Sequence, residues 1–334
     1  YESNEHFTAT QEEIEAALDC PPNGAIFGSS YYRSPFPYSL WIWNAFHESE
    51  SPIGKWVTKT FGNQPVLMSW VNPALRASVA QSQLHNHGYF RGTVNYEEKP
   101  YSKHPKAKIA YHVDCGHLFT IDTVTYSNFP LNADSLIAAS ADEAKIKSGS
   151  PFDVVSLDAE RNRLSNLFRN NGYYYYQPSY ASYRADTVNN PGKVKLDVEL
   201  ADNLPEKALK KWYIGNISIN LRRTFMEELK DSIHYYFFRA YFNGKKPPVR
   251  PRVIMSDMKL RHGQPYDYSK HTESNNRIAS KGMFSSVDFQ FTPRDTTAAC
   301  DTLDLLLNCV FDKPYDFYVE TNYKGKTTGR MGPA

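Results

Sequence analysis

The clearest pattern of apolar and polar positions lies between residues 157 and 200. Four apolar residues recur there at helical spacing and predict one buried helix face: Leu157, Leu164, Leu167 and Phe168. Gly172 can take the left-handed conformation that closes a helix. The tyrosines at 173–176 suit a half-buried strand, and KVKLDVEL at 193–200 alternates apolar and polar residues as a strand with one buried face does. The predicted unit is therefore a helix, a glycine, a strand, a turn and a second strand.

The same unit recurs twice more in the chain. The other copies are LHNHGYF at 84–90, with strands predicted at 93–97 and 107–113, and IASKGMF at 278–284, with strands predicted at 287–291 and 303–310. The closing glycines Gly88, Gly172 and Gly282 lie 84 and 110 residues apart. Because these intervals are the size of a domain, they indicate tandem domains and not a short-period solenoid.

Further elements extend the two later units. Each is preceded by a strand, predicted at 117–126 and 211–221, and by a helical segment. The complete unit is then β-α-α-β-β, in which a three-stranded mixed sheet is covered on one face by two helices. This is a two-layer α+β domain. GSPFD at 149–153 predicts a turn that leads into the central helix, and GQPY at 263–266 parallels it.

The units divide the chain into three expected domains and a terminal segment. Their boundaries are 1–115, 116–203, 210–312 and 313–334. The first domain carries a long aromatic insertion at 21–71 and lacks a clear opening strand, because 1–7 (YESNEHF) is short and polar. A strand predicted at 252–258 indicates a hairpin inserted into the third domain.

Composition narrows the class of protein. With 38 Lys and Arg against 36 Asp and Glu, the net charge is +2, which gives no overall electrostatic footprint for nucleic acid or an anionic membrane. Aromatic residues make up 14% of the chain, which is typical of strands and recognition surfaces. No apolar run reaches the roughly 20 residues of a membrane-spanning helix. Four cysteines lack the CxxC spacing of a zinc ribbon and leave the disulfide state open: Cys20, Cys115, Cys300 and Cys309.

Several longer stretches carry a family resemblance. They are PNGAIFG at 22–28, SLWIWNAF at 39–46, GKWVTKTFGNQPV at 54–66, LHNHGYF at 84–90, GSPFDVVSLDAERNRLSNLFRNNGYYYY at 149–176 and YRADT at 183–187. On these stretches the chain resembles the POTRA regions of the Omp85 superfamily of BamA- and TamA-like outer-membrane assembly proteins. Within it, the resemblance is to the TamL-type lipoproteins of Bacteroidetes. The helix-glycine-aromatic element is the most specific shared feature, and the resemblance covers nearly the whole chain.

The resemblance implies a function, a location and partners. It implies a non-enzymatic scaffold or chaperone region of an outer-membrane protein assembly or translocation factor. The location would be the periplasmic face of the outer membrane of a Gram-negative cell, as a soluble fragment of a lipoprotein whose lipid-bearing cysteine precedes Tyr1. Implied partners are nascent outer-membrane proteins, a TamB-type periplasmic protein and the chain's own C-terminal β-barrel, whose first strand would begin in 313–334. No cofactor, metal or nucleic acid is expected.

The expected mode of binding is β-augmentation, in which an extended client pairs with the free N–H and C=O groups of an edge strand. In POTRA domains the edge is the strand after the glycine, which here falls at 91–98, 177–185 and 285–291. The candidate protein-binding residues are Arg91, Thr93, Asn95, Glu97, Ser179, Ala181, Tyr183, Ser286, Asp288 and Gln290. Backbone pairing tolerates many client sequences, and binding should be weak because the client loses conformational entropy.

Two groups of polar residues raise the question of catalysis or metal binding. Five histidines are close in sequence: His85, His87, His104, His112 and His117. A catalytic zinc site needs three converging protein ligands, whereas histidines at a helix end are favoured by the partial charge there. Glu160 and Arg161 could include a general base, but no glycine-rich cradle or nucleophile elbow accompanies them. We therefore expect surface histidines, a salt-bridged helix surface, and no metal or catalytic residue.

The aromatic insertion allows a different function. Its residues Tyr31, Tyr32, Phe36, Tyr38, Trp41 and Trp43 could form a sugar-binding platform, a protein-docking surface or part of a small core. We favour core or inter-domain packing, because small domains need bulky side chains to bury enough area. An aromatic-rich surface or periplasmic glycan-binding module is the alternative function.

Overall fold

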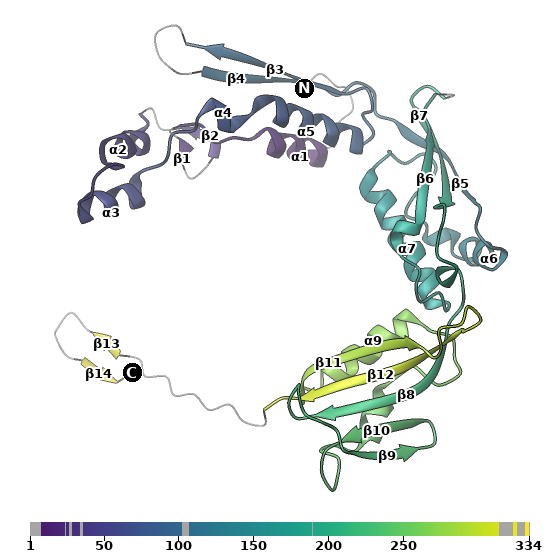
Figure 1. The fold of residues 1–334 in the computed structure, drawn as a ribbon. Coiled ribbons are helices and arrows are strands. Elements are labelled where there is room, and N and C mark those ends of the chain that lie inside the picture. The colour runs from purple at the N-terminus through teal and green to yellow at the C-terminus, as the bar shows by residue number, and fades with distance from the viewer. Residues whose placement is uncertain are drawn as a thin grey trace. The chain divides into compact units, whose positions relative to one another are not determined.

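The structure is a computed structural model that describes residues 8–23, 25–26, 29–33, 36–101, 107–188, 190–313, 323–325 and 331–333. Its class is α+β, as predicted, with helices and several separate sheets along the chain (Figure 1). The chain divides into two compact units. The first comprises Tyr1–Asn128, Asp142–Glu160 and Ser182–Leu200, and the second comprises Phe129–Ala141, Arg161–Ala181 and Ala201–Ala334. The division into three domains at 1–115, 116–203 and 210–312 stays a prediction.

The N-terminal part of the first unit is mostly helical (Figure 1). Its elements are α1 (Thr8–Leu18), β1 (Ala25–Ile26), β2 (Ser29–Arg33), α2 (Tyr38–Phe46), α3 (Pro52–Phe61), α4 (Met68–Val71), α5 (Pro73–Asn86), β3 (Thr93–Pro100) and β4 (Ala107–Asp114). Asn72 caps α5 by accepting the N–H of Leu75 at 3.3 Å, with Pro73 at the first helical position. A small core joins α1, α5 and β3 through Ile14, Ala80, Leu84, Tyr89 and Val94.

The middle of the chain contains a three-stranded sheet. Its elements are β5 (Thr120–Ser127), α6 (Leu131–Ala139), η1 (Ala141–Glu143), α7 (Val154–Asn170), η2 (Pro178–Tyr180), β6 (Ala181–Asp186) and β7 (Lys193–Leu200). The strand order is β5-β7-β6, with β5 and β7 parallel. Val194, Leu196 and Val198 are fully buried on one face of β7, as its alternation predicted. The partition into compact units falls within α7 and at the start of β6.

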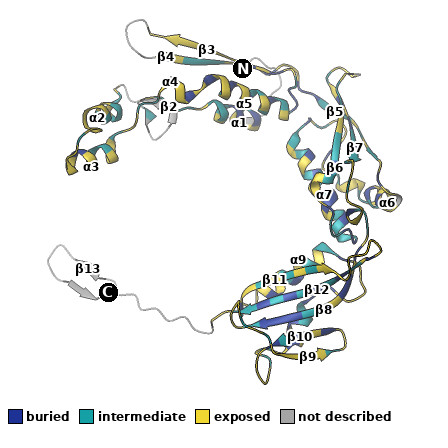
Figure 2. Ribbon diagram, viewed as in Figure 1, coloured by how far each residue is buried: buried dark blue, intermediate teal, exposed yellow. Residues whose placement is uncertain are grey.

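The last part of the second unit is a five-stranded mixed sheet with two helices. Its elements are η3 (Glu206–Ala208), β8 (Tyr213–Arg222), β9 (Asp231–Tyr235), β10 (Phe238–Phe242), α8 (Pro251–Asp257), α9 (Tyr268–Ala279), β11 (Phe284–Pro293) and β12 (Thr302–Phe311). The strand order is β11-β12-β8-β10-β9, and β12 and β10 run parallel to β8. Figure 2 shows buried residues along β8 and β12 at the centre of this sheet. Ile217, Ile219 and Leu221 of β8 belong to its core together with Ile254 of α8 and Ile278 of α9.

The inserted hairpin differs from its prediction. It is formed by β9 and β10, whereas the segment predicted as a strand at 252–258 is helix α8. Pro251 occupies the first helical position, where its missing N–H costs nothing. Ile254 and Met258 lie in the core while Ser256 between them is exposed, which fits a helix and not a strand, where all three would share one face. The strand prediction therefore assigned a period of two to a segment whose period is that of a helix.

The sheets also depart from the uniform three-stranded expectation. Among the described residues, β3 and β4 form a two-stranded sheet, and the sheet around β8 has five strands. Within the aromatic insertion, Tyr38–Phe46 form helix α2. Residues 1–7, His104, and 314–322 with 326–330 lie outside the described residues. The expected lack of an opening strand in the first domain and most of the terminal segment therefore stay predictions. Within 313–334 the described pieces β13 (Tyr323–Gly325) and β14 (Met331–Pro333) pair antiparallel.

Candidate protein-binding edges and the joints that hold them

Two turns of the chain share one hydrogen-bonding pattern. In each, a glycine N–H donates to a strand carbonyl, and the carbonyl of the next residue accepts from the same strand residue. The atoms belong to Gly149, Ser150 and Ile121 in the first turn and to Gly263, Gln264 and Ile214 in the second, at 2.7 to 2.8 Å. Isolated bridges add Thr120 to Pro151 and Tyr213 to Pro265. The parallel between GSPFD and GQPY therefore extends to individual backbone atoms.

A buried polar side chain on the helix after each turn holds the segment before it. Glu160 Oε2 of α7 accepts the backbone N–H of Lys145 at 2.8 Å, and Ser274 Oγ of α9 accepts that of Lys259 at 2.8 Å. Both side chains are fully buried. The prediction that Glu160 lies on the helix surface is therefore wrong, because its carboxylate lies inside and also accepts from the Tyr126 hydroxyl at 2.8 Å. A buried acid requires such hydrogen bonds.

Two helix-closing glycines connect each helix to a later strand. The carbonyl of Gly88 accepts the N–H of Phe119 at 3.0 Å, and the carbonyl of Gly172 accepts the N–H of Trp212 at 2.9 Å. Both glycines have positive φ, 85° and 103° respectively. We call these two places the first joint and the second joint. In each joint, the end of one helix is fixed to the residue before a later strand, β5 in the first joint and β8 in the second.

The residue after each of these glycines is buried. Tyr89 N donates to Leu84 O at 3.0 Å, and Tyr173 N donates to Phe168 O at 3.1 Å. This six-to-one bond is the Schellman closure of a helix. Tyr89 and Tyr173 have exposed fractions of 0% and 4%, so both rings lie inside.

The second residue after each glycine packs against aromatic side chains beyond the joint. The Phe90 ring lies 5.2 Å from that of Phe119 and 4.8 Å from that of Phe152. The Tyr174 ring lies 4.8 Å from that of Tyr266 and 5.3 Å from that of Phe291. These distances are typical of tilted and edge-to-face aromatic pairs. Each joint therefore combines one backbone hydrogen bond with one inserted ring.

The third glycine has a simpler setting. Gly282 follows α9 with φ 66°, and its N–H donates to Ala279 O at 3.2 Å. Phe284, two residues later, is buried and packs against Phe311 with ring centroids 5.0 Å apart. The Phe284 ring thus packs against a residue of β12, the strand that pairs with β11.

The predicted edge residues fall on three different sheets. Arg91 precedes β3, which carries Thr93, Asn95 and Glu97 and pairs with β4; Ser179 lies in η2, and Ala181 and Tyr183 in β6; Ser286, Asp288 and Gln290 lie in β11. β6 and β11 each stand at the end of their strand order. The sites are therefore not brought together into one surface by the sheet pairing.

Two of the predicted residues on β6, Ala181 and Tyr183, have side chains engaged within the fold, whereas Arg184 and Ala185 are exposed. Ala181 is 1% exposed, and the Tyr183 hydroxyl donates to the carbonyl of Leu157 at 2.7 Å. Arg161 Nε donates to Ala181 O at 3.0 Å, which braces the start of the strand. Any binding at β6 would therefore use its backbone and not these side chains.

The ladder of β11 and β12 shows which amides of β11 face outward. Arg294 N donates to Thr302 O at 3.0 Å, and the register pairs Pro293 with Leu303. Because hydrogen-bonded and free positions alternate in an antiparallel pair, the even-numbered residues of β11 bond to β12. The amides directed to the open edge belong to Val287, Phe289 and Phe291. The predicted residues Ser286, Asp288 and Gln290 instead bond toward β12.

The side chains of those three residues line a polar depression on the sheet. Ser286, Asp288 and Gln290 surround a cavity of about 250 Å³ together with Asn220, Asn308 and Arg222. Asn220 Nδ2 donates to Asn308 Oδ1 at 2.8 Å. This surface offers hydrogen-bonding groups beside the edge, although the sequence analysis assigned these residues to the edge itself.

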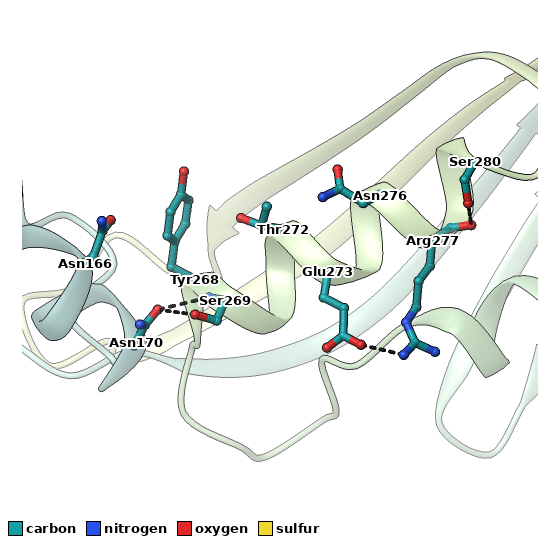
Figure 3. Close-up of a pocket in the computed structure, with 9 residues that line it drawn as sticks. All are labelled: Asn166, Asn170, Tyr268, Ser269, Thr272, Glu273, Asn276, Arg277 and Ser280. Carbon is teal, nitrogen blue, oxygen red and sulfur yellow. Dashed lines mark hydrogen bonds and ion pairs between the residues drawn. The ribbon is translucent and has the colours of Figure 1, made fainter. Parts of the chain in front are cut away.

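A larger groove lies between the end of α7 and α9 (Figure 3). It measures about 760 Å³ and is lined by polar residues of both helices. Asn170 Oδ1 accepts the N–H of Ser269 at 3.0 Å and so adds a second cap to α9, beside Asp267. Glu273 and Arg277 form an ion pair at 2.6 Å. The groove therefore offers a polar surface in which Asn170, Ser269, Glu273 and Arg277 are already engaged with one another in pairs.

Among the described histidines, His271 of α9 has the largest shift in pKa. Burial lowers the pKa of His271 to about 4, and repulsion from Arg169 adds to the effect. Its Nδ1 lies 3.0 Å from the Tyr266 hydroxyl oxygen, and burial raises the pKa of that phenol. The Arg169 guanidinium lies over the Tyr268 ring at 3.9 Å. His271 is thus a neutral core residue that packs beside the second joint.

The described histidines of the first unit have separate partners. His87 Nε2 lies 2.7 Å from Glu13 Oε2, and its Nδ1 lies 3.4 Å from Asp153 Oδ1. His85 contacts the carbonyl of Gly92, and His112 lies 3.9 Å from Glu97. Within the part of the chain that the structure describes, no group of three His, Cys, Asp or Glu is placed to hold a metal ion.

Two further features concern the state of the cysteines and the length of the helices. Cys20, Cys115, Cys300 and Cys309 are free thiols, and the last three are buried. Burial raises the pKa of Cys309 to about 12. No helix among the described residues combines the length and the apolar character needed to cross a membrane.

Comparison with known proteins gives structural similarities only. BamA POTRA3-5 of Haemophilus influenzae matches at 10% identity over 75% of this chain and 83% of that chain, with a TM-score of 0.40. POTRA1-3 of Omp85 from Anabaena matches at 14% identity over 79% of this chain and 91% of that chain, with a TM-score of 0.27. CdiB from Escherichia coli matches at 10% identity over 73% of this chain and 36% of that chain, with a TM-score of 0.22. No protein-family model and no curated protein matches. Identities and scores at this level establish neither a family nor an activity.

Sequence reasoning missed the inserted rings of the joints and the buried acid. The signal for the rings was present, because an aromatic residue stands two positions after each closing glycine: Phe90, Tyr174 and Phe284. Glu160 gave no comparable signal, since its neighbours in ERNR are charged and polar as on a solvated helix face.

Proposed function

We propose that this chain is a POTRA-like region of an Omp85-type outer-membrane assembly or translocation factor. In this proposal it acts as a non-enzymatic periplasmic scaffold that binds extended client segments through strand pairing. The observation that carries the proposal is that β6 and β11 each follow a helix and a glycine with positive φ and stand at the end of a sheet. Such strands present unpaired backbone groups to an extended chain.

The chemistry of these edges fits clients of varied sequence. The outward amides of β11 belong to residues whose rings and methyl groups pack on the core, so they are held in a fixed line. Each backbone hydrogen bond contributes only about 0.5–1.5 kcal/mol net, and the client loses entropy when it extends. We therefore expect weak, sequence-tolerant binding that is little affected by salt.

The finer assignments rest on the sequence resemblance. We propose membership of the TamL-type lipoprotein branch, three POTRA domains, and nascent outer-membrane proteins as clients. A TamB-type periplasmic protein is the proposed partner of the N-terminal domain. The two-stranded β3–β4 sheet, whose strands pair from Thr93 with Asp114 to Pro100 with Ala107, supports a docking role there because its outer strand edges are unpaired in the described sheet.

Alternately N-methylated peptides test the proposal. A fluorescent peptide of alternating apolar and polar residues is titrated with the chain, followed by two versions N-methylated on odd or on even residues. Strand pairing uses the amides along only one edge of the peptide, and these belong to alternate residues. One version should therefore bind like the parent, and the other should lose binding. Equal binding of both versions would exclude strand pairing. A matched peptide with prolines throughout is the negative control.

A further inference from the structure

The helical hairpin α2–α3, residues 38–61, exposes an unusual number of large apolar side chains. Figure 2 shows both helices largely in the colour of exposed residues. Ile53 is 75% exposed and Trp56 60% exposed, which for side chains of this size leaves most of the surface uncovered. The exposed set is Tyr38, Trp41, Phe46, Ile53, Trp56 and Phe61. The expected use of this insertion as core packing therefore does not apply to these residues.

Helix α2 has the composition of a covered helix. Its sequence YSLWIWNAF contains no charged residue, yet none of its residues is buried. A helix that is apolar all round is normally enclosed by protein or by lipid. Trp43 is partly covered by the stacked His47 ring at 5.5 Å, whereas Trp41 is 52% exposed. Among the described residues, nothing encloses this helix to the degree that its apolar sequence predicts.

The arrangement of side chains on helix α3 indicates what kind of surface could cover the hairpin. Ile53, Trp56 and Phe61 lie on one side of the helix, and Lys55 and Lys59 lie on the other. No acidic residue occurs within α3. Apolar and aromatic residues on one face with lysines on the opposite face are typical of a helix that lies in a membrane interface.

The distribution of tryptophan supports the same kind of cover. Four of the five tryptophans in the chain lie between 41 and 70, within this insertion. Tryptophan and tyrosine collect where a bilayer meets water, because their rings are apolar and their N–H and O–H groups are polar. We propose that the α2–α3 hairpin docks on the surface of a phospholipid bilayer. Rings of both helices enter the interface, and Lys55 and Lys59 face anionic headgroups.

This docking is independent of the proposed strand pairing, since it uses a different part of the chain. The whole-chain charge of +2 does not argue against it, because the aromatic rings carry the binding and only two lysines assist. At one end of the hairpin, Glu48 and Glu50 occupy the connection between the helices. We therefore expect a moderate preference for anionic over zwitterionic lipid.

Vesicle binding by the full chain tests the proposal. Vesicles of phosphatidylethanolamine with phosphatidylglycerol should co-sediment the protein. The Trp41→Ser/Trp56→Ser variant should reduce binding about tenfold or more, since each large ring contributes the equivalent of about a tenfold change when buried. The matched control is Tyr236→Ser/Phe237→Ser, because these rings are 90% and 63% exposed on the β9–β10 hairpin. It should bind as the wild type does.

Tryptophan fluorescence provides a second measurement without substitution. On binding, the emission should shift to shorter wavelength, and lipids brominated on the acyl chain should quench it. Trp212 supplies a constant background, because it is 5% exposed and its Nε1 already donates to Lys207 O at 2.9 Å. Lys55→Glu/Lys59→Glu should weaken binding to the anionic vesicles and leave binding to phosphatidylcholine vesicles nearly unchanged.

Three outcomes would overturn the proposal. The first is absence of binding to any vesicle, and the second is equal loss in the control variant. The third is occupation of the surface by something else. Concentration-dependent self-association that disappears in Trp41→Ser/Trp56→Ser would assign the surface to a second copy of the chain. Saturable binding of a soluble glycan with the same sensitivity would assign it to a sugar.

Discussion

At the scale of single residues, the helix-closing glycines differ in what surrounds them. A Cβ on Gly88 would lie 2.8 Å from Phe152 O, which is closer than a Cβ atom approaches a carbonyl oxygen. On Gly172 it would make an ordinary contact at 3.5 Å with Lys211, and on Gly282 it would meet nothing within 4 Å. The three positions thus share positive φ, but only the first joint also needs the space.

This difference predicts an order of destabilisation. Gly282→Ala should lose about 1–2 kcal/mol of unfolding free energy from the left-handed backbone alone. Gly88→Ala should lose about 2–4 kcal/mol, because the backbone of Phe152 or Phe119 must also move. Gly172→Val should lose more than Gly172→Asn, since Asn tolerates positive φ better. Denaturant unfolding of the full chain measures the order; equal losses at Gly88 and Gly282 would contradict it.

His271 predicts a pH dependence of stability. Its pKa is lowered from 6.5 to about 4 in the folded chain, chiefly by burial. Between those values the unfolded chain binds a proton that the folded chain does not, so stability falls as the pH falls from about 6.5 to about 4. The contribution lost at pH 4 is about 1–3 kcal/mol after allowance for solvent screening.

The His271→Gln variant separates this contribution from other acid effects. Glutamine can still accept a hydrogen bond from the Tyr266 hydroxyl but does not titrate. Thermal melts at pH 7, 5.5 and about 4 should show a smaller loss of stability for the variant than for the wild type. His112, 67% exposed at its side chain, serves as the control in His112→Gln. Parallel curves for wild type and His271→Gln would refute the assignment.

At the scale of elements, the joints explain why a glycine and an aromatic residue two positions later occur together. The glycine carbonyl bonds to the next strand segment, and the ring enters the side chains beyond it. Tyr174→Ala should therefore destabilise the second unit by about 2–4 kcal/mol, because a half-buried ring between Tyr266 and Phe291 is removed. It should also speed hydrogen exchange of the Trp212 amide, whose acceptor is Gly172 O.

A control on the same unit makes this prediction specific. Tyr236→Ala removes a ring that is 90% exposed and should change stability by less than about 0.5 kcal/mol. Its effect on exchange at Trp212 should be absent. If Tyr174→Ala were as mild as Tyr236→Ala, the inserted ring would not hold the joint.

The elements show what the sequence could and could not predict. Local signals specified much of the fold: Asn72 and Pro73 open α5, and the glycines at 149 and 263 open equivalent turns. The α8 helix was missed because a short apolar run after a proline fits either period until the core is known. The burial of Glu160 was missed because its partners, Tyr126 and the Lys145 amide, are distant in sequence. Exposure of the aromatic insertion likewise depends on tertiary contacts, which composition does not report.

At the scale of the whole molecule, the proposed function depends on strand edges that are unpaired in the described sheets. The five-stranded sheet has two ends, β11 and β9, and β11 is backed by core side chains such as Val287 and Phe289. Natural sheets usually protect long edges against pairing. An edge kept straight by the core, beside polar side chains at Ser286 and Asp288, is instead suited to reversible pairing. The second joint matters to this proposal because its inserted ring, Tyr174, packs against Phe291 of β11.

Residue-resolved hydrogen exchange tests the central claim, strand pairing at β11, most directly. The amides of Val287, Phe289 and Phe291 face the open edge, whereas those of Ser286, Asp288 and Gln290 already bond to β12. Saturation with an extended peptide of alternating apolar and polar residues should slow exchange at the first three amides and leave the other three unchanged. No slowing at Val287, Phe289 and Phe291, or slowing confined to the groove between α7 and α9, would contradict the account.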